Sequence, residues 1–228
     1  MKTTVQFQST FPHVPPLIVE VEGVEDERVA RAVALEAMVK AGNPITRLQL
    51  GNIEFAYADL SGGVFNDCTF GSAEFIGTNL RGTKFADCNL TAGTPATFDA
   101  ETDLSGAQFA LCDMQGCDLS GTLAEGAVFD ACNLRYSKLA GIRASRSTWA
   151  NCRTGGSDWT DAIMTFGNVR TLEGWPRLLP QFAGTEADKA VLTQFQAAVI
   201  GSSVSGQNTF AEAQAQAEEV RADYPTTN

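Results

Sequence analysis

Six cysteines and one histidine are the residues of this 228-residue chain that could bind a metal, form disulfides or act in nucleophilic catalysis. A metal site needs ligands that converge on one point, and a nucleophile needs a base beside it. His13 stands alone in a proline-rich segment, and no cysteine is close to it in the sequence. Five cysteines instead recur at intervals of 20 residues, with one interval of 24, at Cys68, Cys88, Cys112, Cys132 and Cys152. The spacing therefore predicts a structural repeat, with no metal, no cofactor and no catalytic residues.

A five-residue unit repeats through residues 45–169 and accounts for the cysteine spacing. The unit has a small residue, a polar residue, a large apolar residue and two more small or polar residues, as in residues 58–62, 78–82, 102–106 and 117–121. This period matches neither the 3.6 residues of a helical turn nor the alternation of a flat strand. It indicates a solenoid in which each unit forms one side of a coil and stacked coils share one core.

Four such sides give a coil of twenty residues, which the large residues test independently of the cysteines. Aromatic residues recur in the same register, with the same single interval of 24, at Phe65, Phe85, Phe109, Phe129 and Trp149. Both series are predicted to line the core, where cysteine serves as a small buried residue. Neighbouring thiols in such a column could bond to one another, which a reducing compartment would oppose. The longer interval falls within residues 91–103, which are expected to hold one ordinary side near Phe98 and a four-residue loop carrying Asp99 and Glu101.

These in-register copies resemble the repeats of the pentapeptide-repeat protein family over a little more than half of the chain. The resemblance implies a mainly β fold, a right-handed quadrilateral β-helix. Some members of this family are acidic DNA mimics that bind DNA gyrase or topoisomerase IV, both type II topoisomerases, and protect or inhibit the enzyme. The lead into the repeats through Lys40 and Gly42 is also similar to members carried by bacteriophages. The resemblance therefore implies a non-enzymatic rod with a protein partner and no direct contact with nucleic acid.

The formal net charge of −11 is unevenly distributed along the repeats. Residues 51–134 contain twelve acidic residues and only two basic ones, Arg81 and Lys84, whereas residues 135–153 contain five basic residues and no acid. One interpretation is a solvated surface that keeps the rod soluble. The other is a negatively charged cylinder that enters a groove built for nucleic acid. This second interpretation assigns partner binding to outward acids of the repeats, namely Glu54, Asp59, Asp67, Glu74, Asp87, Asp113 and Asp118.

The segments on either side of the repeats are expected to cover the open ends of the solenoid, because exposed edges would recruit other chains. Residues 1–44 are predicted to form a strand–strand–helix cap, with strands over 5–7 and 17–21. Its helix, over 25–41, is expected to have an apolar face of Val29, Val33 and Met38 together with Ala30 and Ala34. Residues 170–228 are predicted to form a plug and two helices. These helices would pair two rods or dock a partner through Val191, Leu192, Phe195, Val199, Phe210 and Val220.

The remaining expectations concern location and the competing functions. The chain has no apolar run long enough to span a membrane and does not start with a signal peptide, so a cytoplasmic location is expected. The alternative to a DNA mimic is a structural or adaptor scaffold of phage or prophage origin that binds another protein through its end caps. An immunity or antitoxin-like role is a third option, for which no residue is specific.

Overall fold

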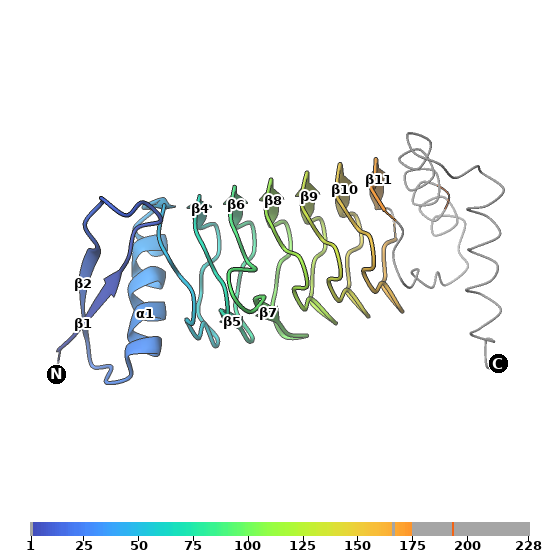
Figure 1. The fold of residues 1–228 in the computed structure, drawn as a ribbon. Coiled ribbons are helices and arrows are strands. Elements are labelled where there is room, and N and C mark those ends of the chain that lie inside the picture. Colours follow the sequence, from blue (N-terminus) through green and yellow to red (C-terminus); the bar gives the residue numbers. More distant parts are fainter. Residues whose placement is uncertain (1, 166, 175–192, 194–228) are drawn as a thin grey trace.

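The computed structural model describes residues 2–165, 167–174 and 193, which form a small N-terminal cap followed by a rod of stacked coils (Figure 1). Its elements in chain order are β1 (Lys2–Phe7), β2 (Leu17–Glu22), α1 (Glu27–Lys40), β3 (Ile45–Thr46), β4 (Val64–Asn66), β5 (Glu74–Phe75), β6 (Lys84–Ala86), β7 (Thr97–Phe98), β8 (Gln108–Ala110), β9 (Val128–Asp130), β10 (Thr148–Ala150) and β11 (Asn168–Arg170). The mainly β solenoid predicted from the five-residue unit is confirmed. The predicted C-terminal plug and helices lie outside the described residues, apart from the first positions after 169.

One side of the rod is a seven-stranded parallel sheet with the order β11-β10-β9-β8-β6-β4-β3. Its central residues pair in register, so that Phe65 lies beside Phe85, Phe109 beside Phe129, and Phe129 beside Trp149. We call it the third side. The other three sides are traced by β-bridges between the outward residues of successive units. The first side runs through Glu54, Glu74, Thr97, Asp118, Lys138 and Asp158. The second side runs through Asp59, Asn79, Asp103, Leu123, Arg143 and Ile163, and the fourth through Gln49, Thr69, Asn89, Asp113, Asn133, Arg153 and Glu173.

Aromatic rings stacked from coil to coil fill the core behind the third side. The ring centroids are 5.2 Å apart for Phe65 and Phe85, 4.7 Å for Phe85 and Phe109, and 5.0 Å for Phe109 and Phe129, with nearly parallel planes. This spacing follows from the separation of neighbouring strands. Each buried ring contributes roughly 1.5–3 kcal/mol through removal from water, and stacking adds to that. A second stack, Phe55, Phe75 and Phe98, lies behind the first side.

The cysteines face the core and connect successive coils. All six are buried and free, and the Cys88 and Cys132 thiols each lie 3.4 Å from a backbone carbonyl of the preceding coil, that of Phe65 or Phe109. At equivalent positions Thr78 and Thr83 donate hydroxyl hydrogen bonds of 2.8 and 2.9 Å in the same way. The side chain at the small inward position therefore also donates a hydrogen bond to a buried carbonyl. The spacing of the cysteines did not predict this second role.

The four extra residues of the insertion are divided between two corners. Leu90 and Phe98, the central residues of successive sides, are eight positions apart instead of five, and Phe98 and Leu104 are six apart. Three extra residues thus precede Phe98 and one follows it. The carbonyl oxygen of Ala92 passes so close to Gly71 that a Cβ atom there would lie 1.6 Å from it.

The cap covers the first coil with a two-stranded antiparallel sheet and the helix α1. Asp26 caps the helix through hydrogen bonds from the amides of Arg28 and Val29. The expected apolar face of the helix is wrong in part, because Val29 and Val33 are 40% and 38% exposed. The buried residues are mainly alanines, with Leu35 and Val39, since small side chains let the helix approach both the strands and the rod.

The coil ladder continues beyond the predicted limit at Val169. Leu172 is buried, and the amide of Thr154 donates to the carbonyl of Glu173. The Thr154 hydroxyl donates to the carbonyl of Gly174. Threonine at a central position therefore keeps the ladder by replacing apolar contact with a hydrogen bond to the next coil.

Phe109→Asp should unfold the rod, because it removes a ring stacked on both sides and buries an uncompensated charge. Loss of the ring alone costs about 3–5 kcal/mol, and the carboxylate adds several more. Gln108→Asp, on the exposed neighbouring position of β8, is the matched control and should melt close to the wild-type temperature. Equal melting temperatures for the two variants, measured by circular dichroism, would contradict the assignment of the core.

Gly71→Ala should destabilise the protein by about 1–3 kcal/mol, because the backbone of Ala92 must move to admit a Cβ atom. Gly155→Ala is the control, since its added Cβ would meet only Gly174 Cα, at 3.8 Å. Urea unfolding of both variants measures the difference. A Gly71 variant as stable as the Gly155 variant would show that the inserted loop does not pack on the fourth side.

Candidate interaction surface

The seven acids that were assigned to partner binding do not form a single face. Glu54, Glu74 and Asp118 lie on the first side, Asp59 on the second and Asp113 on the fourth. Asp67 and Asp87 lie at the corner after the third side, where the backbone has φ angles of 53° and 52°. Aspartate tolerates this left-handed conformation better than most residues. The acids therefore surround the rod.

Several of these aspartates form the turns between sides. Oδ1 of Asp59, Asp113 and Asp118 accepts a hydrogen bond from the backbone amide two residues later, at 3.1–3.3 Å. Asn79 makes the same contact with the amide of Arg81 at 3.2 Å. This is the side-chain-to-backbone bond of an Asx turn, which asparagine and aspartate both support. The polar residue of the unit is thus explained by turn geometry, without a need for its charge.

Basic residues from outside the acidic stretch neutralise part of its charge. Arg28 of α1 lies 3.7 Å from Glu54 and 3.6 Å from Glu74. The remaining pairs join Arg47 to Asp67 at 3.6 Å, Lys138 to Asp118 at 3.0 Å and Arg146 to Glu125 at 3.2 Å. Each exposed pair contributes little to stability, but together they weaken the negative surface. These partners lie outside residues 51–134 and so were not included when the charges of that stretch were counted. The pair of Lys138 and Asp118 could have been predicted, because Lys138 follows Asp118 by one coil of twenty residues.

The two acids of the insertion have different roles. Oδ1 of Asp99 accepts hydrogen bonds from the amides of Gly77, Glu101 and Thr102 and from the Thr102 hydroxyl, at 2.7–3.2 Å. Asp99 therefore holds the insertion against the preceding coil. Glu101 is exposed and accepts a 3.4 Å hydrogen bond from the hydroxyl of Tyr57, so it is available to a partner.

Local hydrogen bonds set the pKa values of the turn aspartates. The hydrogen bonds from Ser61 lower the pKa of the Asp59 carboxyl. Burial alone would raise the pKa of Asp99, but the hydrogen bonds from Gly77, Thr102 and Glu101 outweigh it and lower the pKa. The pKa of Asp118 is also lowered, because bonds from Ser120 and Lys138 outweigh its burial. These carboxylates are held in the ionised form, which suits a structural acceptor and not a general acid.

The thiol column has the electrostatics of a core. Hydrogen bonding to the Cys112 thiol, together with burial, raises the pKa of Cys88 to about 12, and the corresponding bond to Cys132 raises the pKa of Cys112 to about 12. Thiols with raised pKa values are poor nucleophiles and poor metal ligands. Among the described residues, no three cysteine, histidine, aspartate or glutamate side chains gather as metal ligands would.

The cap exposes four apolar residues that sequence reasoning did not single out as functional. These exposed cap residues are Phe11, Val14, Leu17 and Ile18, which are between 36% and 57% exposed. The guanidinium of Arg47 lies over the Phe11 ring, 5.0 Å from its centroid. The alternation of residues along β2 could have identified Ile18 as exposed, because it lies on the outward face of the sheet, paired with Gln6.

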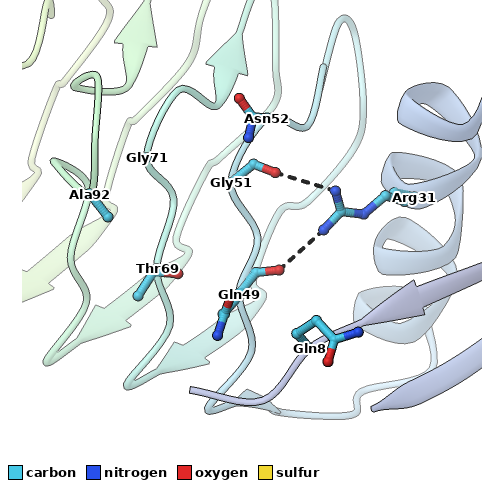
Figure 2. Close-up of a pocket in the computed structure, with 8 residues that line it drawn as sticks. All are labelled: Gln8, Arg31, Gln49, Gly51, Asn52, Thr69, Gly71 and Ala92. Carbon is cyan, nitrogen blue, oxygen red and sulfur yellow. Dashed lines mark hydrogen bonds between the residues drawn. The ribbon is translucent and has the colours of Figure 1, made fainter. Parts of the chain in front are cut away.

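A polar hollow of about 330 Å³ lies where the cap meets the fourth side of the rod (Figure 2). Arg31 of α1 reaches across to the first coil, donating to the carbonyls of Gly51 and Gln49 at 3.3 and 3.1 Å. The lining residues are Gln8, Arg31, Gln49, Gly51, Asn52, Thr69, Gly71 and Ala92.

The predicted docking residues of the C-terminal helices, from Val191 to Val220, lie outside the described residues. In the part of the chain that is described, no helix has the length and hydrophobicity of a membrane span.

Four-sided coils stacked in register define a quadrilateral β-helix. The family model described as pentapeptide repeats matches residues 53–91 and 112–148 in eight copies. These two ranges therefore consist of pentapeptide repeats. The unmatched segment between the two ranges contains the insertion.

Three of the solved structures that match the chain are remote from it in sequence. Full-length QnrB1, a plasmid-mediated fluoroquinolone resistance protein, is 14% identical with a TM-score of 0.40, and the alignment covers 67% of this chain and 97% of QnrB1. A pentapeptide repeat protein from the thylakoid lumen of Arabidopsis thaliana is 22% identical with a TM-score of 0.27, covering 56% and 71% of the two chains. HetL from the cyanobacterium Nostoc, involved in heterocyst differentiation regulation, is 15% identical with a TM-score of 0.17, covering 62% and 91%. No curated protein sequence matches the chain.

Asp99→Ala should cost about 1–2 kcal/mol, in the range measured for lost side-chain caps. Asp99→Asn is the control, because an amide oxygen can still accept from the amides of the turn. Since the folded pKa of Asp99 is lowered, its ionisation stabilises the protein above the unfolded pKa, and this contribution is lost as the pH falls through the folded pKa.

The measurement for this prediction is urea unfolding between neutral pH and the acid range. The stability advantage of the wild type over Asp99→Asn should shrink as the solution becomes acidic. An advantage that stays constant with pH would show that the charge of Asp99 does not contribute.

Proposed function

We propose that this chain is a non-enzymatic rod that binds another protein through its outer surface. The observation that carries the proposal is the continuous register from β3 to β11, because coils locked in register present their outward side chains at fixed spacings. Solenoid proteins use such extended surfaces for binding. The arrangement of titratable groups is consistent with this function, since the thiols are buried and the aspartates of the units cap turns.

Within this proposal, the most specific partner is a type II topoisomerase, DNA gyrase or topoisomerase IV, with the rod acting as an acidic DNA mimic. What supports it is the excess of acidic residues in 51–134, twelve against two. Half of these acids have no ion pair within the described residues: Asp59, Asp87, Asp99, Glu101, Asp113 and Asp130. A surplus of one sign raises the rate of encounter with a groove of opposite potential. The observed ion pairs reduce this surplus and count against the mimic.

The second candidate is a structural or adaptor scaffold, of phage or prophage origin, that binds through its caps. The exposed cap residues favour this candidate, because apolar side chains at the end of the rod can contribute to a protein contact. In that case the rod would set the distance between docked proteins, and its acids would serve solubility.

Supercoiling by purified DNA gyrase, with and without the full chain, separates the two candidates. A mimic should inhibit the enzyme or protect it from a quinolone at micromolar concentration. Neutralising three acids that cap no turn, through Asp87→Asn, Glu101→Gln and Asp130→Asn, should weaken the effect. Ile18→Ser with Val14→Ser changes two of the exposed cap residues, is the matched control, and should leave the effect unchanged.

The results of this experiment identify the binding surface as well as the partner. An unchanged supercoiling reaction at micromolar protein would remove the topoisomerase proposal. Capture of a host protein by the wild type, lost in the cap variants and kept in the acid variants, would support the scaffold. If both the acid variants and the cap variants still captured the protein, neither of these surfaces would be its binding site.

A further inference from the structure

The cap and the insertion, which both depart from the repeat, meet on the fourth side of the rod. The cap places Arg31 and Gln8 against the first coil, and the insertion brings Ala92 over the second coil at Gly71. Between them lies the polar hollow of about 330 Å³ (Figure 2). This volume is at the lower end of the range for small-molecule sites. A regular solenoid repeats the same surface on every coil, so a feature built by both irregular segments is specific to this place.

Arg31 brings a half-buried positive charge to the hollow. Its Nη1 and Nη2 atoms each donate one hydrogen bond to a backbone carbonyl, and its Cζ lies 5.3 Å from the centroid of the Phe7 ring. Its Nε is enclosed and has no partner in the described residues. No carboxylate lies within ion-pairing distance of it there, whereas Arg28, three residues earlier, bridges Glu54 and Glu74. Burial lowers the pKa of Arg31, and the charge of Glu27 opposes that shift.

The rest of the lining contains no acid. Gln8, Gln49 and Asn52 contribute side-chain amides, of which that of Gln49 already donates to the carbonyl of Ser9, and Thr69 contributes a hydroxyl. At several other units an aspartate or asparagine accepts from the amide two residues later, as Asp59 does from Ser61 and Asn89 from Thr91. Gln49 and Thr69 replace that residue here, and neither accepts a bond from the amide of Gly51 or Gly71 in the described structure.

We propose that this hollow binds a small oxyanion, a carboxylate or a phosphate, held by the Arg31 guanidinium with the amides of its lining. A guanidinium has five donors, so each terminal nitrogen keeps one N–H beyond the bond it already makes. Planar paired donors suit the two oxygens of a carboxylate or phosphate.

Nuclear magnetic resonance titration of the full chain tests this site with glutarate and inorganic phosphate as probes, at constant ionic strength. The amides of Gly51 and Gly71 should shift saturably, with a dissociation constant on the order of 1 mM. Arg31→Gln should weaken binding about tenfold, the value of one charge-assisted contact. Arg28→Gln, on the same helix and outside the lining, should bind as the wild type does.

A second variant separates binding from attachment of the cap, because Arg31 also joins the helix to the rod. Thr69→Leu fills the hollow and leaves both Arg31 bonds in place, so it should abolish the shifts without changing the melting temperature. Saturation by phosphate alone or by glutarate alone would identify the anion. Absence of saturation with both probes, or equal weakening in the Arg28 and Arg31 variants, would overturn the proposal.

Discussion

Parallel pairing of each coil with the next, residue upon residue, is the constraint on which this structure depends. Because Phe109 lies on Phe129 and Cys132 contacts the carbonyl of Phe109, each inward side chain must fit against those of the coils on either side of it. A single side chain of the wrong size would disturb both neighbours, since packed interiors leave little free volume. The five-residue pattern in the sequence reflects that packing requirement.

The same pairing explains why acidic residues here do not by themselves indicate a binding face. Where the outward residue of a unit is aspartate or asparagine it closes a turn, and either residue can do so, as Asp113 and Asn133 show on successive coils. Asn133 also donates its side-chain amide to Asp113 at 2.9 Å. Surface charge can therefore vary while the fold is kept, and a partner would be recognised by the acids left over, such as Asp87 and Glu101. Binding through such residues would not compromise the core.

Much of the rod could be predicted from the sequence, because inward residues on the second, third and fourth sides follow equivalent ones at distances of twenty or twenty-four residues. On the first side Phe98 follows Phe75 by 23 residues, and it was still placed correctly in a stack with Phe75. The division of the insertion could not be predicted, since only the total of four extra residues is visible in the spacing. Ion pairs from Arg28 and the position of Arg31 depend on how α1 docks, which periodicity does not encode. The inward face of that helix was predicted only in part, because Ala30 and Ala34 are buried as expected whereas Val29 and Val33 are exposed.

Disulfide trapping between neighbouring coils tests the register most directly. Gln108 and Val128 are outward partners on β8 and β9, at a strand separation of about 4.8 Å that suits a disulfide. The native thiols are buried, so they should not compete. The account predicts that Gln108→Cys with Val128→Cys crosslinks rapidly on mild oxidation, and that Gln108→Cys with Asp130→Cys, two residues out of register, does not. Equal crosslinking of both pairs, or none in the first, would contradict the stacking of coils on which every other conclusion rests.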